Sequence, residues 1–429
     1  MKTFNGDIDW HNESLWYVRE KRDIASKKLP EWESLREAAS DIKAHTLSNL
    51  DKYLEIFEQN CIKNGIKVHW AYDGDELCKI TEKILKSKKA KKILKSKSML
   101  TEECGLNDYL QTKGYEVIDT DLGERIVQLN NQPPSHIVLP AIHLKKEDVA
   151  KIFNQKSDDA VFLTKYARKS LREHFLSGDV AITGVNFAVA NEGCFVVCTN
   201  EGNADLATSL CDTHIACMGI EKLIPDIKHL GIFTRLLARS ATGQNITTYT
   251  SHFKKPSKDK EIHLIITDNG RSDLVANEEF KNALKCIRCG ACMNTCPVFR
   301  RAGGHNYNYV IPGPIGSILG SSRDIKKYAK LSFASTLCGS CDNVCPTKIN
   351  LHQQLLAYRS EYKKVVKEKK DIYYKAAFFI LSKHNLYNFA IKFAKYIPHS
   401  IYKNLWSKGR VAPKLAKKSF REMWDERKR

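Results

Sequence analysis

The chain has 429 residues, of which 42% are apolar, and a formal net charge of +20 at pH 7. This length exceeds the size at which a single core usually divides, so we expect two or three folding units. The N-terminus is polar and acidic, and no run reaches about 18 apolar residues, which argues against a secretory signal and a transmembrane helix. The sequence therefore predicts a cytoplasmic protein, either soluble or peripheral at a membrane.

The first half of the chain has the pattern of an α/β domain. Residues 31–61 place apolar side chains at helical spacing and predict one long amphipathic helix that stops near Gly65. Short apolar runs then alternate with helical patterns, which is typical of a largely parallel sheet. The predicted strands are the runs at 66–72, 91–99, 115–120, 135–143, 179–184, 193–200 and 261–270.

The second half is expected to be helical. From Phe280 the pattern changes to short helical pieces interrupted by Cys, Gly and Pro, and beyond Ser360 amphipathic helices follow, broken at Pro398. We therefore predict four parts: an N-terminal helical region (1–60), an α/β domain (61–278), a helical module (279–360) and a basic amphipathic C-terminal extension (361–429).

The positive charge is concentrated in the tail. From residue 361 to the end there are 19 lysines and arginines against 6 acidic residues, which accounts for 13 of the net 20 charges. A basic tail dotted with aromatic residues suits an acidic partner or an anionic membrane surface at least as well as a nucleic acid. The lysine-rich segment 83–97 is interpreted as a solvated helix face that runs into a strand. We predict no nucleic-acid partner.

Fourteen cysteines in a cytoplasmic chain indicate metal or redox chemistry where they cluster, because disulfides are rare in that compartment. Seven lie in two short stretches. The other seven are scattered and are expected to be buried free thiols that pack as small apolar side chains: Cys61, Cys78, Cys104, Cys194, Cys198, Cys211 and Cys217.

The first stretch, "CIRCGACMNTCP", has the spacing of bacterial ferredoxin ligands, in which the fourth cysteine serves the other of two clusters. Gly290 and Ala291 let the backbone approach a cluster, and Pro297 turns the chain away. A structural zinc site is the alternative, but zinc usually takes two cysteine pairs or a Cys/His set. The motif favours iron-sulfur ligation.

The second stretch, "STLCGSCDNVCP", has three cysteines and aligns with the first from its Cys-Pro backward, which places Ser335 opposite Cys286. Crossed ligation then gives the first cluster a complete set, Cys286, Cys289, Cys292 and Cys345. The second cluster has Cys296, Cys338 and Cys341, and Ser335, a nearby group, a partner subunit or a small ligand must complete it. A three-iron cluster is equally compatible with three thiolates.

The α/β part contains candidate ligand-binding residues. Two glycine-flanked turns in the segment 183–203 suggest a ligand pocket, and the alternative is that they are only tight turns between packed strands. Three side chains of the segment 235–244 can bind a substrate carboxylate, and the alternative is that they belong to a helix that packs by its leucines. No dinucleotide or Walker motif is present. The candidates are Glu192, Asn200, Glu201 and Asn203, and then Arg235, Arg239 and Gln244.

One further metal site can be considered at His214, with Cys211 and Cys217 as companions. The alternative, a histidine buried in a helix beside incidental thiols, is the interpretation that we favour.

With these motifs placed, the chain resembles the lactate utilization protein B family. The resemblance covers nearly the whole chain and rests on the two cysteine stretches and on these segments: "KSKSMLTEECGLN" (95–107), "DTDLGE" (119–124), "PSHIVLPAIH" (134–143), "TGVNFAVANEG" (183–193), "TNEGN" (199–203), "LLARSATGQ" (236–244), "DNGRS" (268–272), "RRAGGHNY" (300–307) and "GPIGSIL" (313–319). The family likewise has three cysteines in its second motif.

The resemblance implies a LUD domain, similar to sugar-isomerase and CoA-transferase folds, followed by an all-α ferredoxin module with two 4Fe-4S clusters. It implies an electron-transfer subunit that acts in oxidation of L-lactate to pyruvate together with two sister subunits, a cysteine-rich-domain protein and a smaller LUD protein, and that is not active alone. Glycolate or another 2-hydroxy acid is an alternative substrate. A non-catalytic iron-sulfur assembly protein is the alternative from another class.

Overall fold

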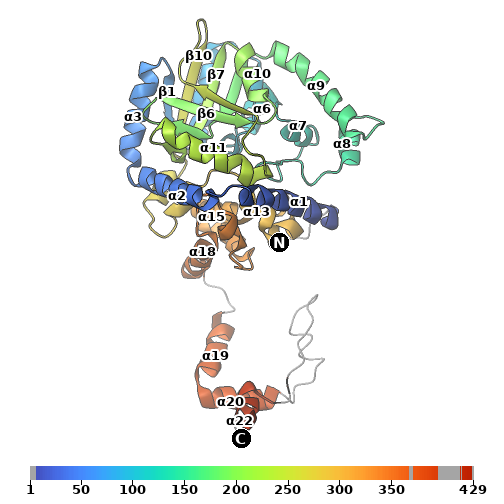
Figure 1. Ribbon diagram of the computed structural model, residues 1–429, viewed down its shortest axis with the longest axis vertical. Helices are drawn as coiled ribbons and strands as arrows, with labels where there is room; N and C mark the ends of the chain where they lie inside the picture. Colours follow the sequence, from blue (N-terminus) through green and yellow to red (C-terminus); the bar gives the residue numbers. More distant parts are fainter. Residues whose placement is uncertain (1–5, 367–370, 395–415, 417, 428–429) are drawn as a thin grey trace. The chain divides into compact units, whose positions relative to one another are not determined.

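The computed structural model describes residues 6–366, 371–394, 416 and 418–427. The chain divides into two compact units, with the boundary after Tyr362. Figure 1 shows the first unit, in which an α/β part and a helical part adjoin. The division into four parts stays a prediction, and helix α18 (Leu351–Val365) runs through the last of the predicted boundaries, at residue 360.

Three helices open the chain: α1 (Ile8–Lys27), α2 (Trp32–Ser48) and α3 (Leu50–Lys63). The prediction of one helix over 31–61 is wrong, because the chain breaks at Asn49, where φ is −130° and ψ is 35°. The Asn49 side chain donates to the carbonyl of His45 (2.9 Å), a local bond that competes with helix continuation. The predicted stop is confirmed, since α3 ends two residues before Gly65, which has φ +87°.

A six-stranded parallel sheet forms the centre of the α/β part, in the order β1 (Lys67–Ala71), β10 (Glu261–Thr267), β7 (Thr213–Gly219), β4 (Val180–Gly184), β2 (Lys92–Lys95) and β3 (Glu116–Asp119). Strand β7 is buried along its whole length, as expected for a parallel strand covered on both faces. The largely parallel sheet is confirmed.

A second, smaller sheet packs beside the first. Its order is β8 (Leu223–Ile224), β5 (Phe187–Val189), β6 (Cys194–Thr199) and β9 (Tyr249–Phe253), with β6 antiparallel to both of its neighbours. The two faces of β7 show how the layers meet. Ala216 and Met218 pack with α3 and the small sheet, whereas Ile215 and Cys217 pack with the helices on the other face.

The helices of the α/β part cover both faces of the central sheet and its edge. They are α4 (Gly74–Ser87), α5 (Met99–Glu103), α6 (Leu106–Thr112), α7 (Leu122–Leu129), α8 (Lys146–Ile152), α9 (Ala160–Ser177), α10 (Asn203–Leu210), the 3-10 helix η1 (Ile220–Lys222), α11 (Ile227–Thr242) and α12 (Arg271–Val275). The lysine-rich segment is α4 running into β2, as predicted.

The strand predicted over 135–143 is wrong, because this segment is an irregular loop. Pro140 lacks a backbone donor, and its carbonyl accepts from the N–H and the hydroxyl of Ser135 (both 2.9 Å), which closes a turn. His136 Nδ1 accepts from the N–H groups of Val138 and Leu139. These local bonds take the place of strand pairing.

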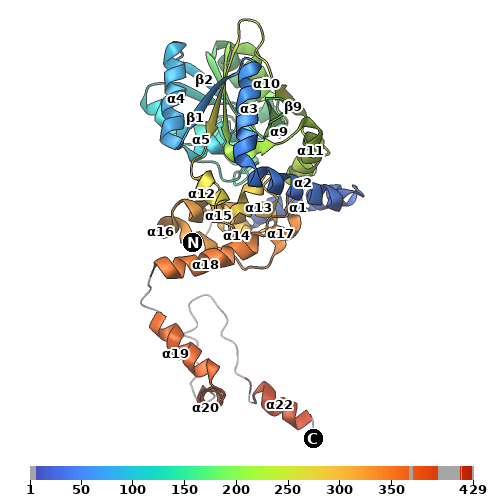
Figure 2. The ribbon, with the colours of Figure 1, turned by 90° about the vertical axis from the view of Figure 1, so that its left-hand side faces the viewer.

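The helical part follows α12, and each element described between residues 281 and 365 is a helix or a 3-10 helix. These are η2 (Lys281–Lys285), α13 (Ala291–Thr295), α14 (Pro297–Ala302), η3 (His305–Tyr307), α15 (Gly313–Arg323), α16 (Ile325–Tyr328), η4 (Ala329–Phe333), α17 (Ser340–Val344) and α18. One core joins them to residues of α1 and α2, including Leu15 and Leu47. Figure 2 shows α1 and α2 lying between the sheet and these helices.

The second unit contains α19 (Asp371–Ser382), α20 (His384–Ala394) and α22 (Phe420–Arg427). The apolar side chains of α19 and α20, such as Ile372, Phe378 and Phe389, are exposed. The predicted break at Pro398 lies outside the described residues. Among the helices described, none combines the length and apolar character that crossing a bilayer requires.

Candidate functional site

The first cysteine motif folds as a short loop that leads into α13. Arg288 and Gly290 both have positive φ values, +60° and +77°, and Gly290 caps α13. After the helix, Cys296 is extended (φ −73°, ψ 117°), and Pro297 occupies the first turn of α14. Two left-handed residues in a loop of this length turn the chain around the three cysteines that precede the helix end.

The second motif repeats this conformation 49 residues later. Leu337 and Gly339 have φ values of +55° and +74°, α17 follows, and Cys345 is extended (φ −66°, ψ 120°). The hydrogen bonds also correspond, since the N–H of Cys296 donates to Met293 and that of Cys345 to Asp342, both at 3.1 Å. The two stretches are therefore structural repeats as well as sequence repeats.

Ser335 occupies the position in the repeat that Cys286 occupies in the first motif. The N–H of Arg288 donates to Cys286 Sγ (3.4 Å), and the N–H of Leu337 donates to Ser335 Oγ (3.1 Å). The hydroxyl oxygen thus takes the hydrogen bond that the thiol sulfur takes in the first motif. The role of Ser335 as a ligand stays a prediction.

The four cysteines assigned to the first cluster line one common cavity. Cys286, Cys289, Cys292 and Cys345 surround it together with apolar side chains from the loop before α8 and from the helical part, namely Ile137, Ile315, Ile349 and Leu351. Burial raises the pKa of Cys289, and the neighbouring Cys345 and Cys286 raise it further. Cys345 Sγ also accepts from the N–H of Ile349 (3.4 Å). Four convergent thiols in an apolar cavity fit the donor set of a cubane cluster.

The spacing of these side chains bears on the choice between zinc and iron-sulfur. Within the described part of the chain, no three Cys, His, Asp or Glu side chains converge closely enough to hold a single metal ion. A single zinc ion needs its ligands within about 2.3 Å of one centre. A cubane needs one thiolate at each of four iron atoms, so its ligands lie farther apart. The four thiols of this cavity match that number, one for each iron atom.

The N-terminal helices support the second motif. Arg36 of α2 donates to the carbonyl of Cys345 through Nε (3.0 Å) and Nη2 (2.8 Å), and Arg22 of α1 donates to the carbonyl of Val344 (3.1 Å). Both arginines are buried. These contacts fix the backbone that presents Cys345 to the first cavity.

The second set of cysteines lies beside the first and is more open. Burial raises the pKa of Cys341, and the charges of Asp342 and Cys296 raise it further, so Cys296 and Cys341 are neighbours. Cys338 is exposed, and hydrogen bonds from the Thr336 side chain and the Ser340 backbone lower its pKa. The charge of Cys341 also acts on Cys292 of the first set. The two predicted cluster sites therefore adjoin, and one of them reaches the surface.

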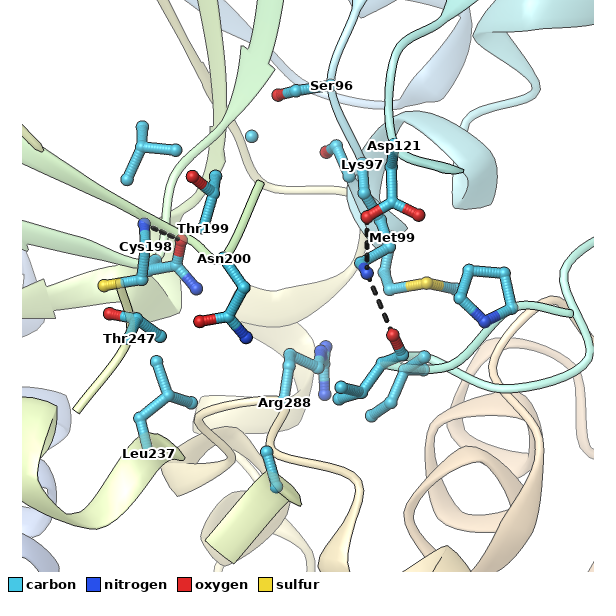
Figure 3. A pocket seen from close by; sticks show the side chains of 18 of the residues that line it. Ser96, Lys97, Met99, Asp121, Cys198, Thr199, Asn200, Leu237, Thr247 and Arg288 are labelled. Atoms are coloured by element: carbon cyan, nitrogen blue, oxygen red, sulfur yellow. Dashed lines mark hydrogen bonds and ion pairs between the residues drawn. The ribbon is translucent and has the colours of Figure 1, made fainter. Parts of the chain in front are cut away.

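A large pocket of about 500 Å³ lies at the carboxyl ends of the central strands. Its walls come from the residues after β2, β4 and β7, from α11, from the loop 137–142 and from the first cysteine motif, which contributes Arg288 (Figure 3). This edge is where α/β sheets usually bind ligands. Ile137 lines both this pocket and the four-cysteine cavity, so the two lie on either side of one loop.

The structure divides the predicted pocket residues into two groups. Asn200, Glu201, Asn203 and Gln244 line the pocket, whereas Glu192, Arg235 and Arg239 are not among its lining residues. Arg235 pairs with Glu31, the N-cap residue of α2. Arg239 donates to the carbonyl of Asn245 (2.6 Å) at the end of its own helix. The two arginines thus make structural contacts.

His214 lies in strand β7, so its predicted place in a helix is wrong. Its Nε2 shares a hydrogen bond with Thr183 Oγ1 (2.7 Å), and its ring packs against Phe195 and Phe253. Burial lowers the pKa of His214 to about 3. Cys217, three residues along the strand, points to the opposite face, and Cys211 donates to the carbonyl of Gly178 (3.5 Å). The three side chains form no metal site.

Several charged residues of the pocket were missed by sequence reasoning. Arg271 donates to Glu221 (2.7 Å) and to Glu103 (2.9 Å), and Arg288 Nη2 lies 3.6 Å from Glu221. Burial alone would raise the pKa of Glu221, but Arg271, Lys222 and Arg288 outweigh it and hold the pKa at about 2. Arg288 lies between two predicted cluster ligands, where the cysteine pattern gives no signal for a pocket residue, and no local signal marks Lys222.

Two family comparisons agree with this arrangement. The LUD domain family matches residues 54–275, and the 4Fe-4S dicluster domain family matches residues 282–349. Lactate utilization protein B of Macrococcus caseolyticus is 45% identical over 355 residues, which cover 80% of this chain and 74% of that protein. This chain belongs to the lactate utilization protein B family. The family assignment places the six-stranded sheet in the LUD domain and both cysteine motifs in the 4Fe-4S dicluster domain.

Other relatives show similar values. Lactate utilization protein B of Oceanobacillus iheyensis is 43% identical, with 82% of this chain and 76% of that protein covered. Among solved structures, a DUF162 family protein from Deinococcus radiodurans is similar with a TM-score of 0.30 at 12% identity, covering 51% of this chain and 98% of that one.

Proposed function

We propose that this chain is the iron-sulfur electron-transfer subunit of a complex that oxidises L-lactate to pyruvate. The observation that carries the proposal is the cavity lined by Cys286, Cys289, Cys292 and Cys345, which joins thiols from both motifs beside a second cysteine set. Loss of two electrons and two protons turns lactate into pyruvate, and two bound clusters supply one-electron carriers for that pair. The relatives are named for lactate utilization, which supports lactate as the substrate.

The chain's own residues have distinct roles in this proposal. Apolar side chains such as Ile137 and Ile315 exclude water from the first thiol set. The backbone N–H groups of Arg288 and Ile349 donate to the sulfur atoms of Cys286 and Cys345. Burial and hydrogen bonds to sulfur are the means by which proteins set the potential of a cluster. The exposure of Cys338 supports the proposal that the second set lies nearer to a partner.

The fourth ligand of the second set is proposed to be Ser335. Its oxygen accepts an N–H bond at the place where the first motif has a ligand sulfur, and Arg359 holds its backbone by donating to its carbonyl (2.8 Å). The fold of the module, an all-α ferredoxin, and the presence of two clusters belong to the same proposal. The matching spacing of the repeats supports both.

The proposed partners are two sister subunits, a cysteine-rich-domain protein and a smaller LUD protein. The basic tail, with exposed apolar side chains on α19 and α20, suits a subunit contact or a peripheral contact with an anionic membrane. Glycolate or another 2-hydroxy acid is the alternative substrate, and an iron-sulfur assembly role is the alternative function.

The test is anaerobic purification of the chain with both sister proteins and an assay of cluster reduction by L-lactate, D-lactate and glycolate. We expect L-lactate to bleach the cluster absorbance in the complex and not in the isolated chain. Faster reduction by glycolate than by L-lactate would identify glycolate as the substrate. No reduction by any 2-hydroxy acid in the intact complex would refute the electron-transfer role and favour the assembly role.

A further inference from the structure

The large pocket of the LUD domain has a positively charged end. Lys222 and Arg288 both line it, and the Lys222 ammonium makes no hydrogen bond or ion pair within the described ranges, although the charge of Glu221 acts on it. The carboxylate of Glu221 is shared between Arg271 and Arg288, and Arg271 also pairs with Glu103. The lining cations Lys222, Arg271 and Arg288 thus outnumber the two carboxylates, and Lys43, whose charge also acts on this group, adds to the positive excess.

Lys222 keeps its charge at neutral pH. Burial lowers the pKa of Lys222 to about 8, with the positive charges of Arg288 and Arg271 contributing and Glu221 acting in the opposite sense. The ammonium form therefore still predominates at pH 7. A half-buried, unpaired ammonium is costly, and an anion placed between Lys222 and Arg288 would remove that cost.

The remaining walls of the pocket are suited to an organic molecule. Leu237, Ala238 and Ala241 of α11 form one apolar wall, and the loop 137–142 forms another. The hydroxyl of Ser96 also lines the pocket, is buried, and has no hydrogen-bond partner among the described residues. A volume of about 500 Å³ is in the range that encloses a medium-sized ligand, and it is larger than a three-carbon acid needs.

The charged end of the pocket adjoins the first cysteine set. Arg288 stands between Cys286 and Cys289 in the chain, and Figure 3 shows its side chain directed into the pocket. The charge of Cys286 acts on Lys222 and on Arg288. An anion that binds here therefore adds negative charge close to the first cluster.

We propose that this pocket binds an organic anion, with its charged group on Lys222 and Arg288 and its apolar part against α11, and that its binding lowers the reduction potential of the first cluster. Negative charge near a cluster disfavours the reduced form. By thermodynamic linkage, reduction of the cluster weakens anion binding by the same factor. The binding part does not rest on the assignment of lactate as substrate.

The binding test uses anilinonaphthalene sulfonate, an organic anion with an apolar body, titrated by fluorescence into the anaerobic, cluster-loaded chain. We expect Lys222→Met to weaken dye binding about tenfold or more, since a charged contact is lost. Lys228→Met, an exposed lysine at the start of α11, is the matched control and should bind as the wild type does. Thr247→Phe narrows the pocket from another wall and should also weaken binding.

The chemical class is tested by competition with hexanoate and with hexyl phosphate, which carry the same apolar body. If hexanoate displaces the dye at the lower concentration, the site prefers a carboxylate, and if hexyl phosphate does so, it prefers a phosphate. Displacement by neither would overturn the proposal. Iron content and thermal unfolding of each variant show that the fold is intact.

The coupling is tested by potentiometric titration of the first cluster with and without saturating dye. We expect a lower potential with dye in the wild type and no shift in Lys222→Met. The competing account is that Lys222 and Arg288 only balance the cluster's negative charge. If Lys222→Met changes the potential but leaves dye affinity unchanged, the competing account holds and the pocket is not an anion site.

Discussion

At the scale of single residues, the difference between the two proposed cluster sites comes down to the pair Cys286 and Ser335. Each side chain accepts a hydrogen bond from the N–H of the residue two positions later in the chain. That residue, Arg288 or Leu337, has a left-handed conformation in both motifs. The backbone is therefore already shaped to present a ligand at position 335. Only the atom presented differs, oxygen in place of sulfur.

Replacing Ser335 with Cys should supply the missing thiolate. We expect the variant to keep its full iron content after mild oxidation, whereas the wild type loses one iron and shows a three-iron signal in electron paramagnetic resonance. The potential of the second cluster should fall, because a fourth thiolate adds negative charge. Ser322→Cys, on α15 and outside the motif, should change neither quantity. An unchanged iron count and potential in Ser335→Cys would show that residue 335 does not face the cluster.

Crossed ligation predicts opposite outcomes for the two cysteines that precede proline. Cys345→Ala should lose the first cluster, although it lies in the second motif, and Cys296→Ala should lose the second. Each variant should lose about three to four iron atoms, with the surviving cluster identified by its resonance spectrum. If each substitution removes the cluster of its own motif, the ligation is not crossed.

The buried His214 gives a pH dependence of known sign. Its folded pKa of about 3 lies below the ordinary value of 6.5, so its contribution to stability is complete above pH 6.5 and is lost as the pH falls toward 3. The loss is about 1.4 kcal/mol per pH unit within that window. Between pH 6.5 and 5.5, the midpoint of urea unfolding should fall less in His214→Asn than in the wild type. If the urea midpoint falls equally in both proteins, a group other than His214 takes up the proton.

At the scale of elements, helix α2 acts as a support for the second motif. Arg36 donates twice to the carbonyl of Cys345, and it also pairs with Glu33 (2.7 Å). Because the arginine is buried and the carbonyl belongs to a predicted ligand, the contact couples an N-terminal helix to the first cluster site.

Arg36→Met should make the first cluster labile and cost about 1.5 to 3 kcal/mol of stability, as expected for a charged hydrogen bond. Iron release to a chelator and urea unfolding measure the two effects. Arg235→Met removes an arginine that pairs with Glu31, the residue before α2, but is partly exposed, and it should cost less stability than Arg36→Met. If Arg36→Met and Arg235→Met release iron at similar rates, α2 does not support the first cluster site.

Elements also show which features the sequence could predict. The strands β1, β2, β3, β4, β6 and β10 were predicted because their apolar runs are rich in Val and Ile. Strand β7, "THIACMG", was missed because Ala, Gly and Met carry little strand signal, and burial on both faces decides its conformation. The loop at 135–143 has a strand's composition, but Pro140 and His136 satisfy the backbone locally.

At the site, chemistry explains what was predictable. Most cluster ligands are cysteines that recur at short, regular spacing within a motif, so the two motifs already indicate the four thiols that line the cavity. The pocket's charged end combines Lys222, Arg271 and Arg288 from three separate segments. No short pattern contains that combination, because it exists only when the strands and the cysteine loop are packed together.

At the scale of the whole molecule, the two compact units divide after Tyr362, and the tail carries much of the net charge. Helix α18 buries Tyr358 and Tyr362 and ends at Val365, so a truncation must leave it whole. Each unit can then be considered for its own role, the first for the cysteine sites and the pocket, the second for contacts with other molecules.

Deletion of residues 366–429 should leave the iron content unchanged and weaken association with anionic vesicles or with the sister subunits. In the full-length chain, binding to vesicles or subunits should weaken as salt is added, because basic residues of the tail contribute to it. Cosedimentation with vesicles and co-purification with the subunits measure the two cases. Loss of iron on truncation would instead make the tail part of the cluster-binding fold.

Two long-range contacts determine when the first cysteine site can form during synthesis of the chain. They join Arg22 to Val344 and Arg36 to Cys345. These contacts join residues 322 and 309 positions apart, and the first cluster set needs Cys345 from the same distant stretch. While the ribosome adds about 5 to 20 residues per second, α1 and α2 emerge long before the backbone that they hold. A nascent chain that ends before residue 345 can therefore complete neither the four-cysteine cavity nor its support, so insertion of the proposed first cluster is a late step.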